Sequence, residues 1–148
     1  MQWKVPMTPE KTTLLVVDDE ELICRVLLRD FKNRFDKVLF ATRLEEAERI
    51  LESGEVTDLV CDYNLGEAVP RGTELLEKWR KAYPQIERAV IYTGTDTSKI
   101  TPAEWIDSTV SKDMPLHCLL SALQGCQRVA DPAGMESAPG SSAISSSR

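Results

Sequence analysis

The sequence contains no hydrophobic run long enough to cross a membrane. Its longest apolar runs, such as those at residues 14–17 and 59–61, are far shorter than the roughly 20 residues that a membrane-spanning helix needs. The first 13 residues also lack the hydrophobic stretch of a secretory signal peptide. We therefore expect a soluble, cytoplasmic protein with no membrane partner.

Cysteine pairs of the C-x-x-C type are absent as well. The four cysteines are Cys24, Cys61, Cys118 and Cys126, and three of them lie in apolar segments. Free cysteine in such a segment behaves as a small hydrophobic residue. Because the expected compartment keeps thiols reduced, we interpret these residues as structural thiols.

An excess of positive charge and a glycine-rich nucleotide loop are two further features that the chain does not have. Its 24 acidic and 18 basic residues give a formal net charge of −6, and no basic arm is present. This balance argues against a nucleic-acid partner, because such proteins usually carry a basic surface. No G-x-G-x-x-G follows the first predicted strand, which disfavours a dinucleotide-binding domain.

The chain has the length and composition of one globular domain. It has 148 residues, and its hydrophobic share of 42% is enough for a single buried core. We place this domain at residues 12–130, after an N-terminal extension over residues 1–11. From residue 131 to residue 148 the composition shifts to Pro, Gly, Ala and Ser, and we expect this tail to be disordered.

Short apolar runs alternate with segments of helical periodicity along the domain. Five such units predict an α/β fold with a parallel sheet covered by helices on both faces. In the fourth unit, Thr101 and Pro102 are typical of an N-cap and a first helical position, so a short helix is expected to begin there. The predicted strands are residues 12–18, 37–40, 58–61, 89–92 and 108–111.

Polar residues that could bind a ligand or take part in a reaction lie at the carboxyl ends of the predicted strands. Asp18 and Asp19 end the first strand, Asp62 the third, Thr93 the fourth and Lys112 the fifth. In open parallel sheets ligands bind at this edge. Carboxylates that converge there repel one another unless a cation neutralises them, and Mg²⁺ prefers such oxygen ligands. A lysine and a hydroxyl beside them would suit a transferred phosphoryl group.

Four motifs in this order resemble the receiver domain of bacterial two-component response regulators. They are V-V-D-D-E, D-L-V-C-D-Y-N-L-G-E, Y-T-G and the late lysine, and the resemblance covers about residues 12–129. It implies a stand-alone, chemotaxis-regulator-like receiver. The implied fold is flavodoxin-like, a doubly wound (βα)5 arrangement with a five-stranded parallel sheet in the order 2-1-3-4-5.

The resemblance also implies a metal site and a phosphoryl-accepting residue. Asp62 matches the phosphoacceptor. Asp19 matches the direct Mg²⁺ ligand, Asp18 acts mainly through a metal-bound water, and the backbone carbonyl of Asn64 completes the protein ligands. Thr93 matches the hydroxyl that binds a phosphoryl oxygen.

Lys112 matches the lysine that pairs with the acidic cluster, and the domain is expected to be a signalling module rather than an enzyme. The implied phosphoryl donor is a sensor histidine kinase or a phosphotransfer protein. The implied output is a downstream protein target on the face formed by the fourth helix, fifth strand and fifth helix. A homodimer is a further possibility.

Two departures from the family pattern leave an alternative open. Thr109 stands where the family usually has an aromatic residue, and Asp113 rather than proline follows Lys112. A degenerate receiver that binds partners without phosphorylation is therefore the second interpretation. A haloacid-dehalogenase-type phosphohydrolase is disfavoured, because Asp18 and Asp19 are adjacent rather than spaced as D-x-D and the chain has no length for a cap.

Overall fold

The computed structural model describes residues 11–124. The chain divides into two compact units, residues 1–112 and residues 113–148, which we describe separately. Most of the predicted N-terminal extension and the whole predicted tail at residues 131–148 lie outside the described residues, as does Cys126. The predicted limits of the domain therefore stay predictions.

The first unit is built on a five-stranded sheet in the order β2-β1-β3-β4-β5, and every neighbouring pair is parallel. This confirms the predicted fold class and strand order. Aliphatic and β-branched residues fill the strands, which suits a sheet that is covered on both faces. The strands are β1 Thr13–Val17, β2 Lys37–Ala41, β3 Asp58–Cys61, β4 Arg88–Thr93 and β5 Ser108–Ser111.

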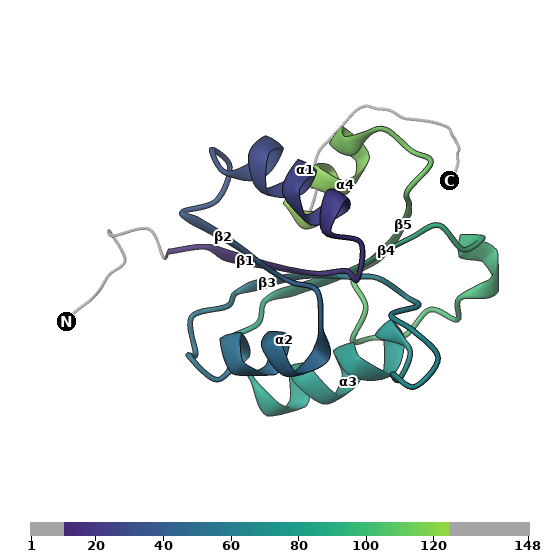
Figure 1. The fold of residues 1–148 in the computed structure, drawn as a ribbon, viewed down its shortest axis with the longest axis horizontal. Helices are drawn as coiled ribbons and strands as arrows, with labels where there is room; N and C mark the ends of the chain where they lie inside the picture. Colours follow the sequence, from purple (N-terminus) through teal and green to yellow (C-terminus); the bar gives the residue numbers. More distant parts are fainter. Residues whose placement is uncertain (1–10, 125–148) are drawn as a thin grey trace. The chain divides into compact units, whose positions relative to one another are not determined.

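Helices of the first unit lie on both faces of this sheet. Helix α1 (Glu21–Phe31) covers one face, and α2 (Leu44–Leu51) and α3 (Gly72–Ala82) cover the other (Figure 1). The second unit contains α4 (Leu116–Leu123). Among the described residues, no helix combines the length and the hydrophobicity needed to span a bilayer.

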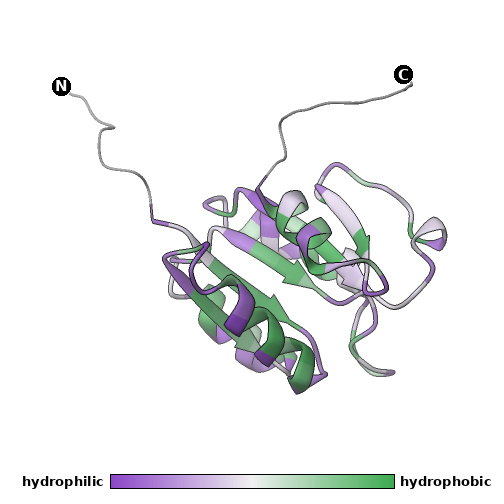
Figure 2. Ribbon diagram, turned by 90° about the horizontal axis from the view of Figure 1, so that it is seen from above, coloured by the Kyte–Doolittle hydropathy of each residue, from purple (hydrophilic) through white to green (hydrophobic). Residues whose placement is uncertain are grey.

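A hydrophobic core fills the space between the sheet and helices α2 and α3. Side chains of β1, β3 and β4 meet those of the two helices there, with the fully buried Trp79 as the largest. The indole N–H of Trp79 donates to Glu48 Oε2 at 3.2 Å, so this polar group is satisfied. Figure 2 shows mostly hydrophobic central strands and helices that carry both hydrophobic and hydrophilic residues, as amphipathic helices do.

The prediction of a fourth helix with Thr101 as its N-cap and Pro102 as its first residue is wrong. Between β4 and β5 the described chain forms only the 3₁₀ turn η1 (Thr97–Lys99), and residues 101–103 have no regular structure. Ile100 is extended and buried in the core, and the Trp105 indole N–H donates to Thr73 O at 2.9 Å. These anchors hold the segment in an irregular path.

Candidate functional site

An acidic cluster lies at the carboxyl edge of the sheet. Val17 and Cys61 are partners in the pairing of β1 with β3, so the residues that follow them, Asp18 and Asp62, emerge side by side. The Asp62 N–H donates to Val17 O at 2.9 Å, which extends this pairing by one residue. Asp18, Asp19 and Asp62 each offer a carboxylate oxygen, and these atoms lie within 4.8 Å of one another. The predicted convergence of the three carboxylates is therefore present.

Two of these carboxylates are buried. Asp18 is 1% exposed and Asp62 is 7% exposed, whereas Asp19 is exposed. Asp18 Oδ1 accepts a hydrogen bond from the Glu20 N–H at 2.9 Å. Asp18 Oδ2 is fully buried and lies 2.8 Å from Lys112 Nζ. The ammonium group balances the charge of this buried oxygen, which would otherwise be costly to bury.

The ammonium group of Lys112 lies among the acidic residues. Lys112 Nζ is 2.8 Å from Asp18 Oδ2, 3.3 Å from Asp62 Oδ2 and 3.4 Å from Glu20 Oε1, and the side chain is 15% exposed. The Lys112 N–H donates to Thr93 O at 2.8 Å, which fixes the backbone at the end of β5 beside the end of β4. The sequence analysis predicted this lysine but did not identify Glu20 as a member of the site. Glu20 is the third acidic residue of the V-V-D-D-E motif, and that position is the signal that could have indicated it.

Thr93 is the last residue of β4 and is 1% exposed. Its Oγ1 accepts a hydrogen bond from the Thr95 N–H at 3.0 Å. This bond uses a lone pair of the hydroxyl oxygen, so the hydroxyl proton can be donated to another acceptor. Thr93 therefore lies at the same sheet edge as the acidic cluster, with its oxygen oriented by the following turn.

Burial and mutual repulsion shift the pKa values of the acidic groups. Burial and, to a smaller extent, the charge of Asp18 raise the pKa of Asp62 to about 6 against the opposing charge of Lys112. Burial also raises the pKa of Asp18. For Lys112, burial alone would lower the pKa, but the hydrogen bond and charge of Asp18 outweigh it and raise the pKa above its usual value. The cluster therefore stabilises positive charge.

The donor set fits a hard divalent cation. Carboxylate oxygens of Asp18, Asp19 and Asp62, which lie within 4.8 Å of one another, are ligands of the kind that Mg²⁺ prefers. Asn64, the predicted carbonyl ligand, lies in the loop after β3, and its N–H donates to Asp62 Oδ1 at 3.5 Å. This contact keeps the loop backbone next to the carboxylates.

Gly72, the first residue of α3, packs directly against the backbone of Asp62. The Gly72 N–H donates to Tyr63 O at 2.8 Å, and a Cβ added to Gly72 would lie 2.3 Å from Asp62 O. No side chain larger than hydrogen fits this approach unless the backbone shifts. The sequence analysis did not identify Gly72 as a residue that positions Asp62. The close approach depends on residues ten positions apart in the sequence, so local patterns carry no signal for it.

The chain is similar in sequence to a curated transcriptional regulator. It is 33% identical over 94 residues to the hydrogenase transcriptional regulatory protein HoxA of Cupriavidus necator. The match covers 64% of this chain but only 19% of HoxA, so the chain spans about a fifth of that relative's length. No family model matches the sequence.

Solved structures of response regulators are similar in fold. A response regulator from Burkholderia pseudomallei, solved with a phosphorylated aspartic acid, a calcium ion and citrate, is 24% identical with a TM-score of 0.66. That match covers 78% of this chain and 68% of the other. The signal receiver domain of an HD domain-containing protein from Pseudomonas fluorescens Pf-5 is 26% identical with a TM-score of 0.64, and the match covers 77% of this chain and 92% of the other.

Proposed function

We propose that this chain, which has the fold of a response-regulator receiver domain, accepts a phosphoryl group on Asp62 in two-component signalling. The observation that carries the proposal is the cluster at the sheet edge. Asp18, Asp19 and Asp62 converge there, and Lys112 Nζ lies 2.8 Å from Asp18 and 3.3 Å from Asp62. A phosphorylated aspartate in the Burkholderia structure is a precedent for this chemistry on this fold.

In the proposed reaction an Asp62 carboxylate oxygen attacks phosphorus in line. The new O–P bond forms as the N–P bond of a donor phosphohistidine breaks, and the imidazole leaves with the electron pair. Bound Mg²⁺ would supply positive charge to the phosphoryl oxygens, held by Asp18, Asp19, Asp62 and the Asn64 carbonyl. Water later cleaves the acyl phosphate and restores the carboxylate.

Lys112 and Thr93 orient and neutralise the transferred group. Lys112 already lies at ion-pair distance from Asp62, so its ammonium can move to a phosphoryl oxygen with little displacement. The Thr93 hydroxyl, with its proton available, can donate to another phosphoryl oxygen. Positioning and charge stabilisation of this kind supply most of the rate enhancement in phosphoryl transfer.

The proposed partners follow from this chemistry. We take a sensor histidine kinase or a phosphotransfer protein in the cytoplasm as the donor. The predicted output face lacks its fourth helix, so the connection at residues 94–107 and the neighbouring β5 form the surface offered to a downstream protein target. A homodimer and action as a stand-alone receiver remain part of the proposal.

The test is phosphoryl uptake from acetyl phosphate and Mg²⁺, followed by intact mass. Wild type should gain one phosphoryl group and Asp62→Ala should gain none, while Asp30→Ala, a control at an exposed acid on α1, should react like wild type. Uptake by Asp62→Ala equal to that of wild type would refute the assignment of Asp62.

The second candidate function is that of a degenerate receiver, which binds partners without phosphorylation. Two features of the expected output face favour it. Thr109 lies in β5 where the family usually has an aromatic residue, and the β4–β5 connection has only a 3₁₀ turn. This candidate predicts no phosphoryl uptake and no change in melting temperature with Mg²⁺. Uptake on Asp62 would exclude it as the account of this chain.

A further inference from the structure

Lys112 is followed by Asp113 rather than by the proline that usually follows this lysine in the family. The side chain is nevertheless held between Asp18, Asp62 and Glu20. Contacts from elsewhere in the first unit must therefore contribute to its position.

The end of β4 provides two such contacts. Thr93 O accepts the Lys112 N–H at 2.8 Å. The residue before it, Tyr92, has its ring under the ammonium, with Lys112 Nζ 6.0 Å from the ring centroid. One dipeptide therefore contacts Lys112 at its backbone and at its charged end.

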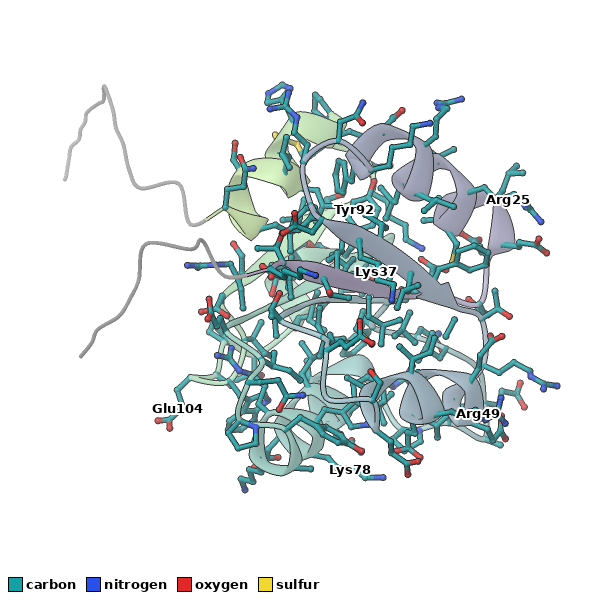
Figure 3. The ribbon with its side chains drawn as sticks, turned by 90° about the vertical axis from the view of Figure 1, so that its left-hand side faces the viewer. Arg25, Lys37, Arg49, Lys78, Tyr92 and Glu104 are labelled. Atoms are coloured by element: carbon teal, nitrogen blue, oxygen red, sulfur yellow. The ribbon has the colours of Figure 1, made fainter. Side chains whose placement is uncertain are left out.

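Tyr92 is fixed within the sheet. It is 5% exposed and pairs with Val110 of β5. Ile91 belongs to the core beneath α2 and α3, and successive strand residues point to opposite faces, so Tyr92 points to the α1 side of the sheet. Figure 3 labels Tyr92 on that side. A buried ring on a central strand has little freedom, which makes it a suitable rigid contact.

The ring offers Lys112 an attraction that differs from that of the carboxylates. The face of an aromatic ring attracts a cation within about 6 Å of its centroid, and the interaction strengthens where water is excluded. Unlike the carboxylates, a neutral ring neither binds a metal ion nor repels a phosphoryl group. It can therefore hold the ammonium in place while the charges around Asp62 change.

We propose that Tyr92 is a positioning residue for phosphoryl transfer and acts through Lys112. The proposal rests on the proposed function of Asp62 as phosphoacceptor. It assigns to the ring, and not to the phenol hydroxyl, the task of holding the ammonium near Asp62 and the incoming phosphoryl oxygens.

The first experiment compares rates of phosphorylation by acetyl phosphate in Tyr92→Phe and Tyr92→Leu. Tyr92→Phe keeps the ring and should react like wild type, whereas Tyr92→Leu should react roughly threefold to tenfold more slowly. Tyr83→Leu, at the C-terminal end of α3, removes a half-buried tyrosine away from Lys112 and should leave the rate unchanged. Equal rates for Tyr92→Leu and wild type would overturn the proposal.

A double-mutant comparison separates positioning from general loss of structure. In a Lys112→Ala background, Tyr92→Leu should cause no further slowing, because the group through which the ring acts is gone. The same slowing in both backgrounds would show that Tyr92 acts independently of Lys112 and would overturn the proposal.

A spectroscopic measurement tests the contact where no rate can be measured. In wild type, the ring current of Tyr92 should shift the NMR signals of the Lys112 ε-methylene protons upfield, and Tyr92→Phe should keep this shift. Unshifted ε-methylene signals in wild type would overturn the proposal, whether or not Tyr92→Leu folds. A wild type that shows the shift but takes up no phosphoryl group would refute the proposed function of Asp62 while leaving the contact between ring and ammonium intact.

Discussion

At the scale of single residues, Asp62 links the chemistry of the site to the stability of the protein. Its pKa is raised from 3.8 to about 6, chiefly by burial. The folded protein therefore retains a proton that the unfolded chain releases between these pH values. As a result, the free energy of unfolding should fall as pH rises through this window, by up to about 3 kcal/mol.

Urea unfolding of the metal-free protein at pH 4 and pH 7 measures this effect. Wild type should lose more stability than Asp62→Asn between these pH values, because the variant carries no titrating group at this position. Saturating Mg²⁺ should restore stability to wild type at pH 7. Equal pH dependence of wild type and Asp62→Asn would contradict the buried, cation-seeking carboxylate described here.

Gly72 supports a second residue-scale prediction. In Gly72→Ala the new Cβ would lie 2.3 Å from Asp62 O, so the β3–α3 loop must shift. We expect a loss of about 2 kcal/mol in the free energy of unfolding and slower phosphoryl uptake. Gly94→Ala is the matched control, because a Cβ at Gly94 has no heavy atom within 4 Å. Similar stability of the two variants, measured by urea unfolding, would contradict the predicted clash.

At the scale of elements, the sequence predicted strands better than it predicted the connection between β4 and β5. Short apolar runs that end in polar residues identify β1, β3 and β4, because a strand buried on both faces has to be hydrophobic along its length. The β5 segment, Ser108–Ser111, has a single buried residue and gives a weaker signal. Thr101 and Pro102 resembled a helix start, but the path of that segment depends on distant contacts. The burial of Ile100 and the hydrogen bond from Trp105 to Thr73 cannot be predicted from the spacing of apolar residues in the sequence.

A partly exposed ion pair between Arg80 and Asp107 holds the end of this connection. Arg80 of α3 donates to Asp107 Oδ2 at 2.7 Å, and the same oxygen accepts the Ala89 N–H at 2.8 Å. Asp107→Ala removes the acceptor of both hydrogen bonds. Hydrogen exchange at residues 94–107 should therefore accelerate, and the free energy of unfolding should fall by about 1–3 kcal/mol.

Mass-detected hydrogen exchange checks this prediction. Lys81→Ala breaks an exposed i,i+4 pair with Glu77 and serves as the control, which should exchange like wild type at residues 94–107. Unchanged exchange of this segment in Asp107→Ala would show that the ion pair does not anchor it.

At the scale of the whole molecule, strand order and strand-end residues carried most of the predictable information. Parallel strands bring their carboxyl ends to one edge, so the placement of Asp18, Asp62, Thr93 and Lys112 at that edge follows once the five strands are recognised. Glu20 and Tyr92 could not be predicted in this way, because their contacts with Lys112 depend on side-chain conformations. The catalytic and metal-binding roles of the site residues stay predictions.

The most direct test of the central claim is to locate the phosphoryl group within the protein. Wild type treated with acetyl phosphate and Mg²⁺ would be digested under conditions that preserve acyl phosphates, and its peptides would be mapped by mass. The account predicts one modified peptide, with the phosphoryl group on Asp62 and its yield abolished by chelation of Mg²⁺. A phosphoryl group on any other residue, or none at all in the folded protein, would contradict it.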